Sequence, residues 1–595
     1  MEQIKELKEL GIASLLDLAL ILPKSFEDLR IKNQPNSGDN SVEIEIKSTL
    51  TRPNTLNVLA YCISWDCSVS IVIFNAKAWH YASFKRGKRL YIYGKSMLYN
   101  GIWQFSNPKI ITKVGQIIPH YKRSIKDSQI QKLIQKYISL DTLIAQGLET
   151  NEANEILSLH NLNETNSALN LTPKQMEILK FIEIFNYLKK LSVKKVLFKA
   201  TAIKPYDISQ WLDNLPFKPT NDQLKALNDI KIDLAKDLAA KRVIMGDVGS
   251  GKTLVILGGA LLNYPNRSIL MAPTTVLATQ LYSEAIRLLP KFMKVIYLQK
   301  GSKNINLEDA NLIVGTHALL YQNLPKSTLI MIDEQHRFGS TQRQKIDELT
   351  RDESLRAHFL QFSATPIPRT LCLIESELVS FSFLKQTPFI KQIKTLIIQN
   401  SGFNALLEHI KAQIQENKQT IIIYPLIEDS QVSNYQSLST AAPFWLNKFQ
   451  KVYITHGKDK QKDDILEQFA NDGNILLATT IVEVGISLPR LSTIVIVGAE
   501  KLGLASLHQL RGRVSRNGGV GWCYLYTKLD NIPSRLKEFA KTLDGFEVAK
   551  IDLKNRQAGD ILDGTIQHGA TFEYYDMEED IAQKAKSRLA ALRDK

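Results

Sequence analysis

Apolar and polar positions alternate with a period of two over residues 42–125, after a stretch with helical spacing. Asn100-Gly101 lies between two of these alternating runs and is a strong hairpin signal. The preceding residues, 1–41, read as short amphipathic helices that end in a polar loop over 31–41. We expect N-terminal helices over 1–41 and a small antiparallel β-barrel over 42–125.

Helical spacing returns over residues 126–210, which we expect to form linker helices. The end of this segment carries lysines with no acid among them: Lys189, Lys190, Lys194, Lys195, Lys199 and Lys204. Such a run is typical of a solvated helix face, and contact with nucleic acid is the alternative interpretation.

Beyond residue 211, apolar runs alternate twice with helical stretches. The first set of runs is 241–245, 268–273, 312–316 and 329–333, and the second is 420–426, 451–457, 474–480 and 492–498. Strands separated by helices form parallel sheets, which are buried on both faces and therefore read as continuous apolar runs. The pattern predicts a multi-domain α/β protein with tandem α/β domains over 211–385 and 386–528, followed by a charged helical region over 529–595.

The composition predicts the class of partner and the cellular compartment of the protein. The chain has 595 residues and a formal net charge of +15, which favours a polyanionic partner such as nucleic acid. Its four cysteines, Cys62, Cys67, Cys372 and Cys523, are too few for a disulfide framework and indicate a reducing compartment. No signal peptide and no membrane-spanning run is recognisable, so we expect a cytoplasmic protein without a membrane partner.

A phosphate-binding loop follows the first strand of the first α/β domain. It comprises Gly246, Asp247, Val248, Gly249, Ser250, Gly251, Lys252 and Thr253, and an apolar helical stretch follows it. Glycines let backbone N–H groups surround phosphate oxygens, while the lysine reaches the β and γ phosphates and Thr253 can ligate Mg²⁺. The context of strand, loop and helix predicts binding of ATP.

Two adjacent carboxylates end another apolar strand, in the run LIMIDEQH. Asp333 is placed to hold Mg²⁺, and Glu334 is placed to polarise the attacking water as a general base. The pair predicts hydrolysis of the nucleotide in addition to its binding.

The segment DEQHRFG (333–339) resembles the corresponding box of the RecG branch-migration helicases of superfamily 2. Further blocks agree with that family in order and spacing, over 215–223, 271–280, 315–320, 363–371, 478–489 and 508–516. The resemblance covers nearly the whole chain. It implies two RecA-like motor domains, an OB-fold wedge domain in the barrel region, and a translocation motif within 544–569.

The resemblance also implies roles for single residues of the motor. Gln223 and Gln509 would contribute to ATP binding, with Gln223 on the adenine. Arg513 and Arg516 would act as arginine fingers on the γ-phosphate, and their place on the second motor domain would make hydrolysis conditional on closure of the cleft. Coupling of the nucleotide to the DNA surface falls to Ser363, Thr365 and His336.

The resemblance implies DNA contacts in the regions that flank the two motor domains. Phe74 matches the family's wedge aromatic and Trp79 is a weaker candidate, since exposed aromatics can stack on unpaired bases. Arg556 and Gln567 match the translocation motif, although Gln557-Ala558 replaces its Gly-Pro pair. Ser487, Ser515 and Thr275 are further departures, at positions where the family has Asp, Gly and Glu.

The expected function is that of an ATP-dependent double-stranded DNA translocase and helicase in recombination and repair. Its substrates would be branched DNA, namely forks to be regressed, four-way Holliday junctions and R-loops. The expected cofactors are ATP and Mg²⁺, the expected state is a monomer, and a single-stranded-DNA-binding protein is a candidate partner. The alternatives are a translocase of the transcription-repair coupling type, an RNA helicase, and a nucleotide-gated DNA-binding scaffold without turnover.

Overall fold

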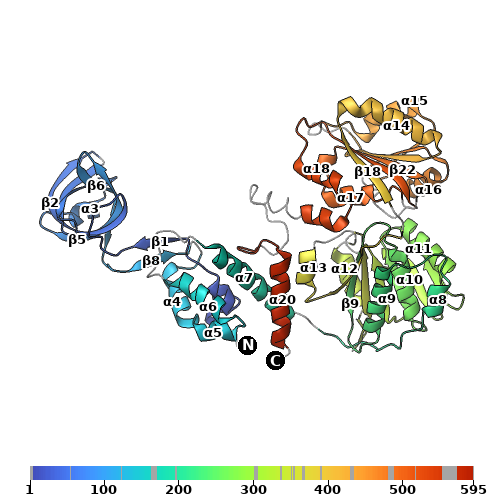
Figure 1. The fold of residues 1–595 in the computed structure, drawn as a ribbon, viewed down its shortest axis with the longest axis horizontal. Coiled ribbons are helices and arrows are strands. Elements are labelled where there is room, and N and C mark those ends of the chain that lie inside the picture. The colour runs from blue at the N-terminus through green and yellow to red at the C-terminus, as the bar shows by residue number, and fades with distance from the viewer. Residues whose placement is uncertain are drawn as a thin grey trace. The chain divides into compact units, whose positions relative to one another are not determined.

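The computed structural model places the chain in two compact units, Met1–Lys190 with Thr571–Lys595 and Leu191–Ala570. Figure 1 shows the elements of both units. The structure describes residues 5–593 except 54, 122–123, 162–170, 194–196, 300–305, 335–337, 339, 350, 353–354, 365–368, 389–390, 429–433, 480–487, 516–517 and 553–571. Within these residues no helix is both long enough and apolar enough to span a bilayer.

A closed β-barrel forms one end of the first unit (Figure 1). Its strands are β2 (Gly38–Arg52), β3 (Thr55–Cys62), β4 (Cys67–Phe74), β5 (Arg89–Tyr99), β6 (Ile102–Ser106) and β7 (Lys109–Ile111), with α3 (Ala78–Ser83) between β4 and β5. Pairing in the order β2-β3-β4-β6-β5 is closed by β2 on β5, which leaves one mixed sheet because β4 and β6 are parallel. Asn100 and Gly101 both have positive φ, as a tight hairpin turn requires. The first strand of the barrel starts at Gly38, inside the predicted loop. The stretch predicted as helical also contains a strand, β1 (Ser25–Asp28), so the prediction of helices alone over 1–41 was wrong there.

Helices form the remainder of the first unit. They are α1 (Lys5–Glu9), α2 (Leu15–Ala19), α4 (Asp127–Tyr137), α5 (Leu140–Ala145), α6 (Thr150–His160), α7 (Pro173–Val193) and α20 (Glu579–Arg593), with the hairpin of β1 (Ser25–Asp28) and β8 (Ile117–His120) beside them. The chain's end is fixed to α7, because the Glu183 carboxylate accepts three backbone N–H bonds of 2.7 to 2.8 Å from residues 573–575. Arg588 of α20 binds Glu152 of α6 at 2.6 Å.

The first lobe of the second unit contains a seven-stranded parallel sheet. Its strands, in the order β11-β12-β10-β13-β16-β9-β17, are Val295–Leu298, Leu312–Thr316, Ser268–Ala272, Leu329–Asp333, His358–Ser363, Lys241–Gly246 and Ser380–Leu384. Helices cover both faces (Figure 1): α8 (Ser209–Asp213), α9 (Asn221–Leu234), α10 (Lys252–Leu262), α11 (Thr275–Leu288), α12 (Ser340–Leu349) and α13 (Arg369–Glu375). A turn η2 (His317–Tyr321) and a short hairpin of β14 (Arg351–Asp352) and β15 (Leu355–Arg356) complete the lobe.

The second lobe repeats this plan with six parallel strands. In the order β18-β23-β22-β19-β21-β20 they are Lys391–Ile398, Gly519–Tyr526, Leu491–Val497, Gln419–Ile423, Ile475–Ala478 and Val452–Thr455. The helices are α14 (Phe403–Gln415), α15 (Leu438–Lys448), α16 (Lys462–Asp472), α17 (Leu504–Arg511) and α18 (Ser534–Lys541), with the turns η4 (Asn400–Gly402) and η6 (Ala499–Lys501).

Each sheet is buried on both faces, which explains the continuous apolar runs in the sequence. Along β13, Leu329 and Met331 pack into the core under α9 and α10, while Ile330 and Ile332 pack into a second core on the opposite face. The strands of the second lobe divide in the same way. All eight apolar runs predicted as strands are confirmed as β9, β10, β12, β13, β19, β20, β21 and β22.

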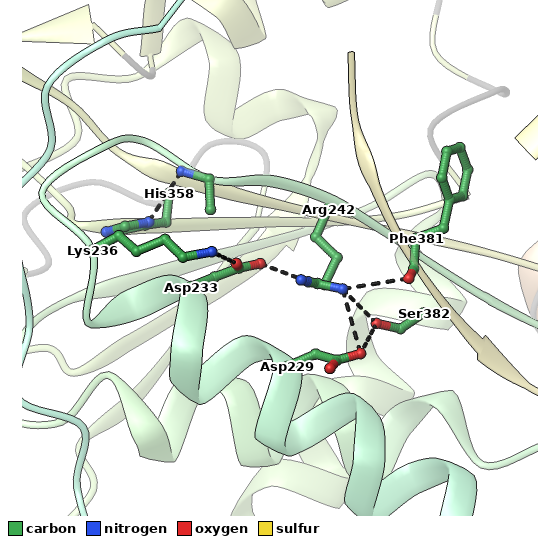
Figure 2. Close-up of polar contacts among 8 residues, drawn as sticks. Asp229, Asp233, Lys236, Arg242, His358, Phe381 and Ser382 are labelled. Atoms are coloured by element: carbon green, nitrogen blue, oxygen red, sulfur yellow. Dashed lines mark hydrogen bonds and ion pairs between the residues drawn. The ribbon is translucent and has the colours of Figure 1, made fainter. Parts of the chain in front are cut away.

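A buried ion network fixes the edge strand β17 to α9 and β9 (Figure 2). The Arg242 Nε donates to Asp233 at 2.6 Å, and its NH1 group donates to the Ser382 hydroxyl at 2.8 Å. The same hydroxyl donates to Asp229 at 2.7 Å. Since Arg242 lies at the start of β9 and Gly246 at its end, the network lies at the opposite end of this strand from the phosphate-binding loop.

Candidate active site

The phosphate-binding loop runs from the end of β9 to the first turn of α10. Gly249 and Gly251 have φ of 84° and 77°, a left-handed conformation that glycine adopts without strain. A Cβ atom on Gly251 would lie 2.2 Å from the Gln223 side chain, and one on Gly246 would lie 2.3 Å from the Ser250 hydroxyl. Gly251 is therefore favoured by both backbone conformation and close packing, Gly249 by conformation, and Gly246 by packing.

Lys252 and Asp247 stabilise the loop with internal hydrogen bonds. The Lys252 Nζ donates to the carbonyl oxygens of Gly246 and Asp247 at 2.7 and 3.2 Å. The Asp247 Oδ1 accepts the Val248 N–H at 2.6 Å. Thr253 is partly exposed in the first turn of α10. Lysine, threonine and the helix N-terminus thus gather at one place, as phosphate binding requires.

Gln223 braces the loop from α9. Its Oε1 accepts from the Thr220 N–H and its Nε2 donates to the Ser250 carbonyl at 2.9 Å, with the side chain buried. Thr220 in turn caps the helix, completing a capping box. Contact with adenine stays a prediction for Gln223, whose amide here is bonded to protein groups.

The two carboxylates lie at the carboxyl end of β13, next to the end of β16. Glu334 has φ of 54°, and its backbone N–H donates to the Phe362 carbonyl at 2.8 Å. Its Oε1 accepts the Ala364 N–H at 3.0 Å. The predicted coupling residue Ser363 is therefore adjacent to a residue that touches the predicted general base. Thr365 and His336 lie outside the described residues.

Burial is the main influence on Asp333. It raises the pKa of this carboxyl, as does the charge of Glu334, while the positive charges of Lys252 and Arg513 act in the opposite direction. The Asp333 Oδ1 is buried and has no hydrogen-bond partner among the described residues. A buried carboxylate oxygen without a protein partner suits Mg²⁺, which takes oxygen ligands.

Arg513 comes from the second lobe, directly after α17, and is buried. Its positive charge acts to lower the pKa of Asp333, against the larger effect of burial. Gln509, also predicted for ATP binding, is buried on α17. Arg516 lies outside the described residues.

Two residues of α17 were not predicted for the site. The His508 Nε2 lies 2.7 Å from the Asp247 Oδ1, and the Arg511 NH2 group lies 3.0 Å from the His508 Nδ1. They stand in the same block as Arg513, but their partner Asp247 is remote in sequence, so spacing carried no signal for the contact.

The predicted DNA-contacting aromatics are exposed on the barrel. Phe74 ends β4 with 51% of its surface exposed, and Trp79 on α3 stacks against His80 at 3.6 Å between ring centroids. Phe105 and Tyr93 are buried. Arg556 and Gln567 lie outside the described residues.

Two lysines of the lysine-rich segment make contacts inside the first unit, whereas Lys194 and Lys195 lie outside the described residues. Lys189 donates to the Gln146 carbonyl at 2.9 Å, and Lys190 pairs with Asp17. These two lysines are bonded to protein groups, and contact of the segment with nucleic acid stays an alternative prediction.

Comparison with known proteins places this arrangement in a family. The model described as DEAD/DEAH box helicase matches residues 220–374, and the model of the helicase conserved C-terminal domain matches 401–518. These ranges contain the phosphate-binding loop with the two carboxylates, and α17 with Arg513, respectively. The two α/β domains predicted from the sequence thus correspond to the two domains of helicase family models.

Full-length similarity extends beyond the motor. The ATP-dependent DNA helicase RecG of Helicobacter pylori (strain ATCC 700392 / 26695) is 41% identical over 96% of this chain and 95% of its own. RecG of Aquifex aeolicus is 30% identical over 95% of this chain and 79% of its own. A solved structure of RecG bound to a three-way DNA junction matches with a TM-score of 0.56 and 26% identity, covering 98% of this chain and 83% of that one. The chain therefore belongs to the RecG family of ATP-dependent DNA helicases.

Proposed function

We propose that the chain uses ATP hydrolysis to move on double-stranded DNA and to remodel branch points, with replication forks, four-way junctions and R-loops as substrates. The observation that supports this most is that the His508 Nε2 of the second lobe lies 2.7 Å from the Asp247 Oδ1 in the phosphate-binding loop of the first lobe. A site completed by a second lobe makes hydrolysis depend on closure, and closure is relative motion of the lobes.

Each residue of the site has a distinct task in this proposal. The N–H groups of the phosphate-binding loop and Lys252 bind the phosphates. Glu334 accepts the proton of the attacking water, and Arg513 with Arg516 stabilises charge on the γ-phosphate. Mg²⁺, held by Asp333 and Thr253, would neutralise phosphate charge when bound. The buried Oδ1 atom of Asp333 suits the binding of this ion.

Coupling to DNA would run through the strand ends beside Glu334. The Ala364 N–H binds the Glu334 carboxylate, so a change at the nucleotide is passed to the segment that contains Ser363 and Thr365. His336, two residues after Glu334 in the sequence, would take part as well. The translocation-motif residues Arg556 and Gln567 would then grip the duplex.

The branched substrate is supported by two features outside the motor. Phe74 presents an exposed aromatic ring at the end of a barrel strand, where it can stack on an unpaired base. The similar RecG structure is bound to a three-way junction. We also propose that the protein acts as a monomer and that a single-stranded-DNA-binding protein recruits it.

A strand-separation assay on a three-way DNA junction tests this function. The wild type should release one strand in the presence of ATP and Mg²⁺, whereas Lys252→Ala and Glu334→Gln should each remove ATP hydrolysis and strand release together. Undiminished hydrolysis by Lys252→Ala, or ATP turnover without strand release by the wild type, would count against the proposal. Strand release from an RNA duplex, without strand release from the DNA junction, would favour the RNA helicase alternative.

A further inference from the structure

The carboxyl end of α17 connects the second lobe to the phosphate-binding loop through a chain of buried polar groups. The His508 Nε2 lies 2.7 Å from the Asp247 Oδ1, and the Arg511 NH2 group lies 3.0 Å from the His508 Nδ1. The Arg511 NH1 group donates to the Phe539 carbonyl of α18 at 2.9 Å. Asp247, His508 and Arg511 are called the clasp below.

The proton positions in the clasp follow from the partners. A guanidinium can only donate, so the His508 Nδ1 accepts the hydrogen bond from Arg511. The Nε2 atom of a neutral imidazole then carries the hydrogen and donates it to Asp247. The clasp is thus a carboxylate and a guanidinium joined by a neutral ring that uses both of its nitrogens.

Burial raises the free-energy cost of breaking these hydrogen bonds. His508 is 3% exposed and Arg511 is 1% exposed, so neither can exchange its partner for water without opening the lobes. The Arg511 guanidinium also lies over the Phe539 ring, 4.0 Å from its centroid. Breaking one member would leave buried polar groups unpaired, which is costlier than losing a surface hydrogen bond.

The lobes touch closely at the same point. Gly512 follows Arg511 directly, and a Cβ atom there would lie 2.8 Å from the Val248 Cβ. Any larger residue would push the loop and α17 apart. Gly512 and the clasp therefore fix one distance between the phosphate-binding loop and the end of α17.

We propose that the clasp positions Arg513 for hydrolysis, which makes His508 and Arg511 positioning residues of the ATPase site. Arg513 is two residues after Arg511 on the same turn, so whatever fixes the end of α17 also fixes the arginine. An arginine that stabilises developing charge must be held closely, because a displacement of 1 Å can cost roughly 100-fold in rate. This inference rests on the proposed role of Arg513 in hydrolysis.

Two substitutions at one position test the clasp. Glutamine offers one N–H donor group and one oxygen acceptor at a reach similar to that of histidine, whereas phenylalanine keeps the ring but has neither. With DNA present, His508→Phe should lower kcat by at least about tenfold with KM for ATP nearly unchanged, as for an interaction made in the transition state. His508→Gln should recover most of that loss.

A double-mutant cycle separates positioning from general destabilisation. If His508 acts through Arg513, His508→Phe should add little to the loss already caused by Arg513→Ala. Equal losses from His508→Phe in both backgrounds would overturn the proposal. An unchanged kcat in Arg513→Ala alone would instead overturn the role of Arg513 that underlies it.

Matched variants complete the test. His409→Phe removes another histidine hydrogen bond of the second lobe, that to the Thr493 hydroxyl at 3.0 Å, and should leave kcat unchanged. If His508→Phe does not fold, Asp247→Ala removes the clasp's partner outside the core of the second lobe. Asp247→Ala should lower kcat, and Asp247→Ala with wild-type kcat would contradict the proposal.

Discussion

Single residues of the site are held in backbone conformations that narrow the choice of side chain. Ser515, which follows α17 and Arg513, has φ of 54°. Left-handed backbone costs a residue with a Cβ atom roughly 1–2 kcal/mol. Its hydroxyl also lies close to Gly521, where an added Cβ would be 2.7 Å from the oxygen.

We expect Ser515→Gly to stabilise the turn that follows α17. Relief of the strained φ outweighs the extra entropy that glycine has in the unfolded chain, so the net gain should be up to about 1 kcal/mol. Hydrogen exchange of the residue-515 amide, which donates to the Leu491 carbonyl, measures the change. The same substitution in the interior of α17, Ser506→Gly, should destabilise; a loss of protection in both variants would refute the strain.

The sequence predicted this site well where a residue's role depends on its local context. Lys252 and the glycines follow a strand and open a helix, and Asp333 ends an apolar run, so pattern alone located them. The brace from Gln223 to Ser250 and the bond from His508 to Asp247 could not be predicted. Their partners meet only after the chain has folded, and neither pair has a characteristic spacing.

Among the elements, the edge strand β17 depends on polar contacts more than the central strands do. Arg242 joins β9, α9 and β17 in the network of Figure 2. Burial raises the pKa of Asp233, but its hydrogen bonds to Arg242 and Lys236 outweigh this and leave the pKa lowered. The stabilisation is therefore complete above about pH 4 and is lost as the pH falls through the lowered pKa.

Arg242→Ala should destabilise β17 and β9 by about 3–5 kcal/mol, because it leaves buried Asp233 without its guanidinium. Hydrogen exchange of the two strands at pH 7 measures the loss, and the advantage of wild type over variant should shrink toward pH 3. Arg287→Ala, which removes an exposed pair with Glu284, should cost no more than about 1 kcal/mol. Equal costs for the two arginines would show that the network is not structural.

Five strands of the two parallel sheets were absent from the predicted set, namely β11, β16, β17, β18 and β23, and polar residues or glycines account for this in β16, β17 and β23. β16 contains His358 and Gln361, β17 alternates serine with phenylalanine, and β23 begins with glycines. Each is nevertheless placed by neighbours in its sheet, since pairing is decided by tertiary contacts that local composition does not record.

At the scale of the whole molecule, the end of the chain belongs to the unit that begins it. Residues 571–595 join the first unit, where Glu183 of α7 accepts three backbone N–H bonds and Arg588 binds Glu149 and Glu152. The sequence indicated a single C-terminal region over 529–595. A helix that docks on a surface made several hundred residues earlier leaves no periodic signal of its destination.

The barrel's role is testable without disturbing the motor. Phe74→Ala should lower kcat/KM for strand separation of a three-way junction by roughly 5- to 150-fold, the value of about 1–3 kcal/mol for one stacked base. ATP hydrolysis stimulated by linear duplex should not change. Leu59→Ala removes an exposed aliphatic side chain from the same barrel and serves as the control. Equal effects of the two substitutions would exclude stacking by Phe74.

The most direct test of branch-specific, ATP-driven action compares hydrolysis on two DNAs. ATP turnover by the wild type should be measured with a three-way junction and with a linear duplex of equal length and composition, across a salt series. We predict a kcat/KM for the junction that exceeds that for the duplex by about tenfold, as one stacked base would provide, at every salt concentration. Equal stimulation by junction and duplex would contradict the account.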